Sequence, residues 1–227
     1  MLENRLGITD STELAREGER ISKQKAIQMF ESGFLDRLEA GTVQCLTEIH
    51  RILFEDIYPF AGKIREVNIS KGAFWFAPVM YLGEALKNIE KMPQKEFEQI
   101  VEKYVEMNIA HPFREENGRS TRIWLDLIFK NELGFVVDWS QVDKEDYLLA
   151  MERSPIRDIE IKYILKNALT DKINNREVYR KGIDHSYYYE RYIVYKTMDL
   201  PKKNRKDKKW SLGILREHAS KTLALNF

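Results

Sequence analysis

The sequence predicts a mainly α-helical protein with one small β-hairpin. Apolar residues recur at helical spacing in several segments, which are separated by short polar breaks or by breaks containing Pro or Gly. Only residues 64–76 combine β-branched and aromatic residues around a turn, Ser70-Lys71-Gly72. An isolated hairpin is marginally stable, so we expect this one to pack on the helices or to pair with a further strand.

The expected elements follow in chain order. Residues 1–25 are polar and charged, which predicts a loose N-terminal arm with one short helix. A long amphipathic helix is expected from Phe34 to Phe54, and His50 within it is interpreted as a packed or capping histidine. Shorter helices are expected at Tyr81–Lys91, Glu96–Ala110, Gly118–Leu133, Asp143–Met151 and Asp158–Ala168.

Composition bounds the class of protein. A chain of 227 residues forms one domain, or one domain with a tail, and its 43% hydrophobic and 32% charged residues are ordinary for a globular protein. A net charge of +1 gives no general attraction to nucleic acid or membrane, and we expect neither as a partner. The single Cys45 fits a reducing compartment, and no apolar run approaches the roughly 18 residues of a membrane span, so we expect a cytoplasmic location.

The most informative stretch is the polar segment 111–122, His-Pro-Phe-Arg-Glu-Glu-Asn-Gly-Arg-Ser-Thr-Arg. Pro112 disfavours the α conformation at His111, so one helix should end there. Asn117-Gly118 is suited to begin the next helix, with Asn117 as the N-cap. The unpaired amides at such a helix start favour a bound anion.

The side chains in this segment are those that polyphosphate chemistry needs. Arg119 and Arg122 share one helix face and add positive charge suited to phosphate. Glu115 offers an oxygen ligand of the kind Mg²⁺ uses, and His111 can accept a proton near neutral pH. The alternative is an ordinary polar loop between helices, which the complete set of groups in this order disfavours.

The segment resembles the signature of the Fic domain family, His-Pro-Phe-x-(Asp/Glu)-Gly-Asn-(Gly/Lys)-Arg-x-x-Arg, and the resemblance extends from about Phe30 to about Tyr192. It implies an all-α Fic-type fold with a flap hairpin and a C-terminal inhibitory helix. The implied organisation is an arm at 1–25, the Fic domain at 26–173 with the flap at about 63–77, an inhibitory helix region at 174–196 and a basic, flexible tail at 197–227.

The implied activity is transfer of AMP from ATP to a Ser, Thr or Tyr hydroxyl of a target protein, with Mg²⁺ or another divalent cation. His111 would be the base, Glu115 the metal ligand, and flap residues would dock the target. The implied nucleotide-binding residues are Phe113, Arg114, Glu116, Asn117, Gly118, Arg119 and Arg122. The implied flap residues are Asn68, Ile69, Ser70, Lys71 and Gly72.

A second stretch, Ser186-Tyr187-Tyr188-Tyr189-Glu190-Arg191, resembles the inhibitory motif (Ser/Thr)-x-x-x-Glu-(Gly/Asn) of the same family. The resemblance implies that Glu190, with Ser186 on the same helix face, pairs with Arg122 and displaces the ATP γ-phosphate. One guanidinium cannot bind a carboxylate and a phosphate bidentately at the same time. Arg191 departs from the motif. The family also allows Glu190 a role in removing AMP, as well as self-modification and a homo-oligomer that restrains the inhibitory helix.

Glu116 also departs from the signature, which has Gly, or occasionally Ala, at this position. If the backbone there has positive φ, a residue other than Gly costs about 1–2 kcal/mol. We therefore expect impaired transfer. Two alternatives stay open: a catalytically silent Fic fold that acts as a binding module or toxin–antitoxin-type partner, and a Fic enzyme that uses another phosphate-containing donor.

Overall fold

The computed structural model describes residues 2–72, 74–188 and 196–200. Among them the α-helices are α1 (Ser11–Glu31), α2 (Val43–Phe54), α3 (Val79–Lys91), α4 (Phe97–Ala110), α5 (Asn117–Leu133), α6 (Lys144–Arg153), α7 (Ile159–Asn167) and α8 (Arg176–Tyr188). Short 3-10 helices span Leu35–Arg37, Trp139–Gln141 and Thr197–Asp199. Strand β1 (Ser70–Lys71) pairs antiparallel with β2 (Phe74–Trp75), and β3 (Val136–Val137) pairs antiparallel with β4 (Leu169–Thr170). The predicted mainly helical fold with a hairpin is confirmed.

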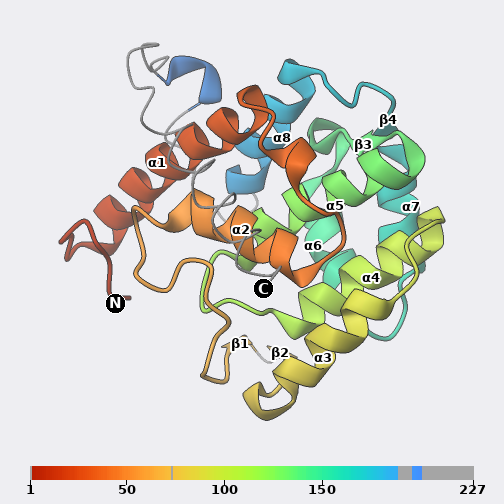
Figure 1. Cartoon of the computed structure of the whole chain (residues 1–227), viewed down its shortest axis with the longest axis horizontal. Helices are drawn as coiled ribbons and strands as arrows, with labels where there is room; N and C mark the ends of the chain where they lie inside the picture. Colours follow the sequence, from red (N-terminus) through yellow and green to blue (C-terminus); the bar gives the residue numbers. More distant parts are fainter. Residues whose placement is uncertain (1, 73, 189–195, 201–227) are drawn as a thin grey trace, which may run out of the picture.

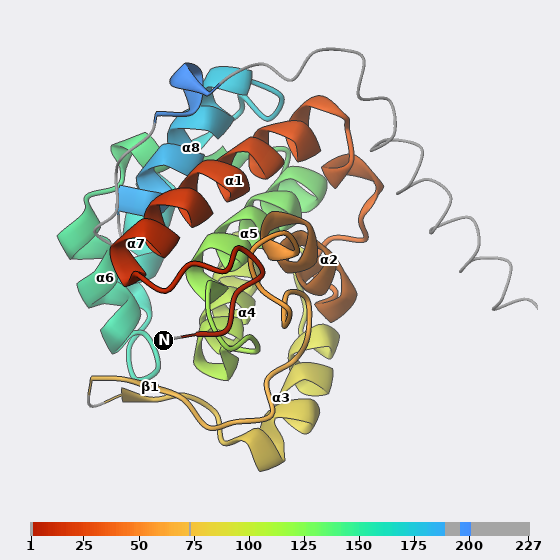
Figure 2. The same ribbon diagram turned by 90° about the vertical axis from the view of Figure 1, so that its left-hand side faces the viewer.

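Helix α5 forms the centre of the molecule (Figure 1) and packs against α2, α4 and α8. Its Trp124, Leu125, Ile128 and Phe129 are fully buried, as a helix surrounded by other helices requires. In both views the hairpin β1–β2 and α3 lie at one end of the molecule, whereas α1 and α8 lie at the opposite end (Figures 1 and 2). The polar loop and the start of α5 contact the hairpin region on one side and α8 on the other.

The expected loose N-terminal arm is wrong, because α1 is a 21-residue helix that packs against α2 and α8. Asp10 caps α1 by accepting a hydrogen bond from the Glu13 amide. The periodicity is hard to detect because polar residues, Glu19 and Lys23 among them, occupy buried positions of this helix. Lys23 pairs with Glu19 in the same helix and with Asp184 of α8, which lies far away in the sequence.

The single helix expected from Phe34 to Phe54 is also wrong, because it is divided into a 3-10 turn and α2. Gly41 adopts φ +85° between them, a conformation that L side chains rarely adopt. Thr42 then caps α2 by accepting from the Cys45 amide. A Cβ at residue 41 would also collide with the Gln94 side chain.

The first strand of the hairpin begins later than expected. The sequence predicts that the first strand lies before the turn Ser70-Lys71-Gly72, yet the ladder starts at Ser70, within that turn. Arg65 explains the difference, because its backbone amide donates to Pro112 O (2.8 Å) and not to another strand. The hairpin β3–β4 was not anticipated, since two-residue strands are too short to show a period.

The C-terminal region is described only in part. Thr197 is buried, and its amide and hydroxyl donate to Asp184 of α8, so the segment expected to be a tail begins with a packed turn. The rest of the predicted tail, residues 201–227, lies outside the described residues, as do Glu190 and Arg191. None of the helices that the structure describes is long and apolar enough to cross a membrane.

Candidate active site

The polar loop 111–116 connects the C-terminus of α4 to the N-terminus of α5. It begins at His111, which has left-handed backbone angles (φ 47°, ψ 65°), and the His111 amide still donates to Met107 O (3.0 Å). Its last residue, Glu116, is left-handed as well (φ 65°, ψ 19°). The loop thus turns sharply at both ends, and this brings the end of one helix next to the start of another.

His111 is held in one orientation. Its ring stacks on Phe76 beside the flap, with centroids 3.7 Å apart, and its Nδ1 lies 3.2 Å from Asn108 O. Because a carbonyl can only accept, Nδ1 carries the proton and Nε2 is the nitrogen that can take one. Burial lowers the pKa of His111 to about 4, with Lys71 and Arg65 adding to the lowering, so the ring is neutral at physiological pH. A neutral, oriented imidazole can accept a proton at Nε2, as a general base does.

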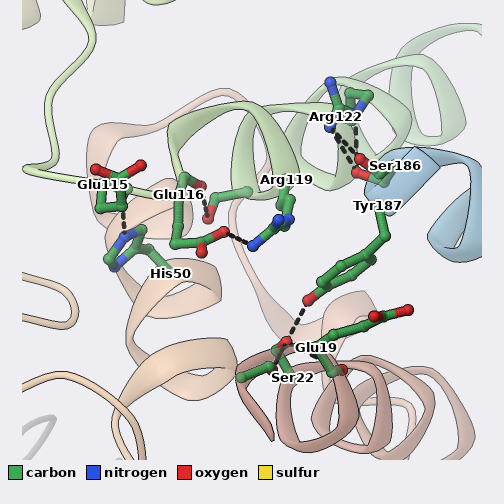
Figure 3. Close-up of polar contacts among 11 residues, drawn as sticks. Glu19, Ser22, His50, Glu115, Glu116, Arg119, Arg122, Ser186 and Tyr187 are labelled. Carbon is green, nitrogen blue, oxygen red and sulfur yellow. Dashed lines mark hydrogen bonds and ion pairs between the residues drawn. The ribbon is translucent and has the colours of Figure 1, made fainter. Parts of the chain in front are cut away.

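Buried groups below the loop fix the backbone at Glu115. The Gly62 amide donates to Nδ1 of His50 (2.9 Å), so His50 Nε2 carries the proton and donates to Glu115 O (3.0 Å; Figure 3). Phe113 is fully buried and stacks on His50 at 3.8 Å. His50 is therefore packed and bonds to backbone groups, as expected, and the Glu115 side chain stays exposed.

Asn117 has a different local role from the expected N-cap. Glu116 occupies the cap position of α5 and makes no side-chain cap bond. The Asn117 side chain instead turns back across the loop, accepting from the Phe113 amide and donating to Phe113 O, both at 2.8 Å. This pair of bonds holds the loop closed between His111 and the N-terminus of α5.

Glu116 does not turn away into water. Its carboxylate pairs with Arg119 one turn along α5, and the two side chains are only 11% and 9% exposed (Figure 3). The Arg119 guanidinium also lies over the Tyr187 ring, 4.1 Å from its centroid. The positive charge that the sequence offers to a phosphate is thus matched by a carboxylate from the same loop.

Arg122 faces α8. Its Nε and Nη2 donate to the Ser186 hydroxyl (2.9 and 2.7 Å), and Nη2 also donates to Ser186 O (3.1 Å). Arg122 and Ser186 are both buried. The structure therefore brings together the second arginine of the loop and the first residue of the predicted inhibitory motif (Figure 3).

Helix α8 is held on its other side by α1. Lys23 has a fully buried ammonium that lies 2.9 Å from both Glu19 and Asp184. The Tyr187 hydroxyl is hydrogen-bonded to Ser22, and Lys23 lies over the Tyr187 ring. Sequence reasoning missed this polar cluster, because no local pattern shows which residue of α8 would meet α1.

The predicted flap residues lie on the hairpin. Ser70, Lys71 and Gly72 are exposed, and Ile69 O accepts from the Phe76 amide. The Asn68 side chain accepts from the Val79 amide and so caps the start of α3. Arg114 is exposed and lies 5.8 Å from the Phe60 ring centroid. The roles of these residues in binding a target or a nucleotide stay predictions.

The loop suits a divalent cation that takes most of its ligands from a nucleotide. No cluster of three or more His, Cys, Asp or Glu side chains suited to a metal occurs in the described part of the chain. Glu115, exposed with its backbone fixed by His50, is the carboxylate beside the start of α5. Mg²⁺ bound to phosphates commonly takes one or two protein carboxylates and water, which matches this arrangement.

The loop and most of the two helices that flank it lie within a stretch that matches a known protein family. Residues 41–129 match the Fic/DOC family. The chain is 30% identical over 190 residues to the protein adenylyltransferase VbhT of Bartonella schoenbuchensis, covering 77% of this chain but only 38% of VbhT. It thus spans less than half of that relative's length. It is 28% identical over 183 residues to a Salmonella typhimurium protein named probable protein adenylyltransferase Fic, covering 75% of this chain and 88% of that one.

Solved structures share the fold. The BepC protein of Bartonella tribocorum, solved with bound AMPPNP, superposes with a TM-score of 0.61 at 20% identity, covering 75% of this chain and 92% of that one. The FIC domain of Bep8 from Bartonella sp. 1-1C gives 0.65 at 17% identity, covering 76% and 92%. At these identities the likeness establishes the arrangement of helices.

Proposed function

We propose that this chain, which belongs to the Fic/DOC family, transfers AMP from ATP to a Ser, Thr or Tyr hydroxyl of a target protein. One observation carries the proposal: a single loop joins a neutral, oriented imidazole at its start to the N-terminus of α5, whose first two turns carry Arg119 and Arg122. The protein relatives named adenylyltransferases support the same reaction class.

Each residue of the site has a distinct role in the proposed transfer of AMP. Nε2 of His111 takes the proton of the target hydroxyl while the hydroxyl oxygen attacks the α-phosphorus of ATP. The bond from that phosphorus to the bridging oxygen breaks, pyrophosphate leaves, and AMP stays on the target. Arg119, Arg122 and the α5 amides stabilise negative charge on the phosphates. A divalent cation, held by Glu115, would neutralise part of that charge.

The C-terminal helix is proposed to inhibit this reaction. Arg122 already binds Ser186 of α8, and Glu190 lies four residues further along the chain. A carboxylate from Glu190 at Arg122 would compete directly with the ATP γ-phosphate.

Glu116 is proposed to lower activity further. Its left-handed backbone costs about 1–2 kcal/mol for a residue with a Cβ. Its carboxylate pairs with Arg119, so a phosphate has to displace it or tolerate its charge. The same pair favours the second candidate function, a catalytically silent Fic fold that binds a protein partner, because the anion site is already matched internally.

Transfer of label from α-³²P ATP with Mg²⁺, to the protein itself and to a lysate, tests the proposal. Four proteins are compared: the sequence as it stands, Glu190→Gly, Glu116→Gly and the double variant, each with a His111→Ala partner. Strong labelling by Glu190→Gly that His111→Ala abolishes supports an autoinhibited adenylyltransferase in which Glu116 is tolerated. Labelling only with Glu116→Gly indicates an enzyme disabled by Glu116. No His111-dependent labelling by any of the four would contradict the proposal and favour the binding module.

A further inference from the structure

Four consecutive backbone carbonyls at the entrance to the loop accept hydrogen bonds from two residues, Arg65 and Ala77. The Ala77 amide donates to Ile109 O (3.0 Å). The Arg65 side chain donates to Ala110 O through Nη2 (3.0 Å) and to His111 O through Nε (2.8 Å), and the Arg65 amide donates to Pro112 O (2.8 Å). The backbone carbonyls of residues 109–112 therefore accept hydrogen bonds from residues that lie outside the loop.

These hydrogen bonds satisfy carbonyls at the C-terminus of α4 that the helix itself leaves without partners. The last four carbonyls of a helix have no partner within the helix, and the helix dipole makes that end negative. At the end of α4, Met107 O accepts from the His111 amide and Asn108 O pairs with His111 Nδ1, while Ile109 O and Ala110 O are satisfied by Ala77 and Arg65. A buried guanidinium at this position adds a favourable interaction with the dipole.

The guanidinium of Arg65 donates hydrogen bonds from all three of its nitrogens. The residue is only 4% exposed, and its guanidinium also donates to Val67 O (2.8 Å) and Ala77 O (2.5 Å). Burial lowers the pKa of Arg65, but an arginine remains charged at neutral pH. A lysine at this site would keep the charge, but it has one nitrogen and could not reach carbonyls on several sides.

The same residues are the two ends of the hairpin stem. Arg65 precedes β1 and Ala77 follows β2, so every residue of the hairpin β1–β2 lies between the two points that are tied to the loop. Phe76, next to Ala77, is the residue that stacks on the His111 ring. The backbone on both sides of His111 and the ring itself are therefore held by the stem of the hairpin.

We propose that Arg65 is a positioning residue that joins the hairpin stem to the backbone of His111, so that the conformation of the hairpin sets the position of the base. The proposal rests on the proposed function for its catalytic consequence. Arg65 lies outside the signature loop. It would affect the reaction step through His111 and would not take part in binding the nucleotide.

The test introduces Arg65→Lys and Arg65→Met into the Glu116→Gly, Glu190→Gly protein. We expect the limiting rate of self-labelling or lysate labelling at saturating ATP to fall by roughly 10- to 100-fold in both variants, as a displacement of about 1 Å costs. The ATP concentration at half-maximal rate and the affinity for AMPPNP by calorimetry are expected to change less than two-fold. Arg153→Met, which removes an exposed arginine paired with Glu160, is the control and should leave both quantities unchanged.

Hydrogen exchange followed by NMR provides a readout that does not need transfer. In both variants the Ala77 amide should lose protection together with the Phe76 amide, while the α5 interior keeps its protection. If nucleotide affinity and the cooperativity of unfolding fall together with the transfer rate, Arg65 has a purely structural role and the proposal is overturned. An unchanged transfer rate in Arg65→Lys would overturn it as well. If the parent double variant transfers nothing, the proposed function fails by itself. Protection at Ala77 and Phe76 that is unchanged in both variants then overturns the proposed coupling.

Discussion

At the scale of single residues, Glu116 separates this chain from the family signature in two ways that experiment can distinguish. The backbone strain belongs to any residue with a Cβ at φ 65°, whereas the competition for Arg119 belongs to the carboxylate. A glycine removes both effects, and a glutamine removes only the charge. Comparing the two variants therefore shows whether backbone strain or the negative charge of Glu116 lowers the activity.

We expect Glu116→Gly to raise the transfer rate of the Glu190→Gly protein at least ten-fold, since about 1.4 kcal/mol corresponds to one decade. If charge dominates, Glu116→Gln recovers most of the gain in AMPPNP affinity measured by calorimetry. If strain dominates, Glu116→Gln resembles the unchanged protein. Equal rates for the Glu, Gln and Gly proteins would show that this position does not limit the reaction.

Two histidines with lowered pKa values, His50 and His111, predict the sign of the pH dependence of stability. Burial lowers the pKa of His50, as it does that of His111, from 6.5 to about 4. Between pH 4 and 6.5 the unfolded chain binds more protons at these residues than the folded chain does, so stability should rise with pH across that window and level off above it. At pH 5 each histidine should cost about 1–2 kcal/mol relative to pH 7.

Urea unfolding between pH 4.5 and 7 measures this slope. His50→Gln retains a side-chain donor toward Glu115 O but does not titrate, so its slope should be smaller than that of the unchanged protein. An equal slope in the two proteins would mean that other groups set the acid sensitivity.

At the scale of elements, the contact between α1 and α8 depends on a buried charge. Lys23 contacts Glu19 and Asp184 with no exposure of its own side chain. Removing one partner of a buried ion pair leaves an uncompensated charge, which typically costs 3–5 kcal/mol. The α8 helix should therefore depend on Lys23 more than on any exposed pair.

We expect Lys23→Met to lower the free energy of unfolding by about 3 kcal/mol, as measured by urea titration. The triple variant Lys23→Met, Glu19→Gln, Asp184→Asn should recover part of that loss, because it removes the unpaired carboxylates. Lys95→Met, which removes a lysine that is 79% exposed beside Glu132, serves as control and should change stability by less than about 0.5 kcal/mol. A loss in Lys23→Met no larger than in the control would contradict the ion-pair argument.

At the scale of the whole molecule, α8 closes one side of the candidate active site because it can approach Trp139 closely. A Cβ added at Gly182 would lie 3.1 Å from Trp139 Cδ1, tighter than most real contacts. Leucine favours the helix more than glycine does, by roughly 1 kcal/mol, but its side chain does not fit between α8 and Trp139.

Gly182→Leu should therefore lift α8 away from the body of the protein. We expect faster hydrogen exchange in α8 and, if α8 is inhibitory, faster transfer than in the unchanged sequence. Gly83→Ala is the matched control, because a Cβ at Gly83 meets nothing within 4 Å and should simply stabilise α3. Unchanged exchange in α8 of Gly182→Leu would show that the helix accommodates the larger side chain.

The sequence alone determined the helical class, the hairpin and the positions of His111, Glu115, Arg119 and Arg122, because spacing along one loop and one helix is a local property. The family resemblance made backbone strain at Glu116 conditional on a positive φ, and the structure gives that residue a φ of 65°. Only the tertiary structure decided that α1 packs through buried polar residues, that Glu116 pairs with Arg119, and that Arg65 holds the carbonyls beside His111. Each of these depends on partners that come together only after folding. A polar or charged group can be buried favourably only beside a partner that forms a hydrogen bond or ion pair with it. The periodicity of the sequence does not show which residue that partner is.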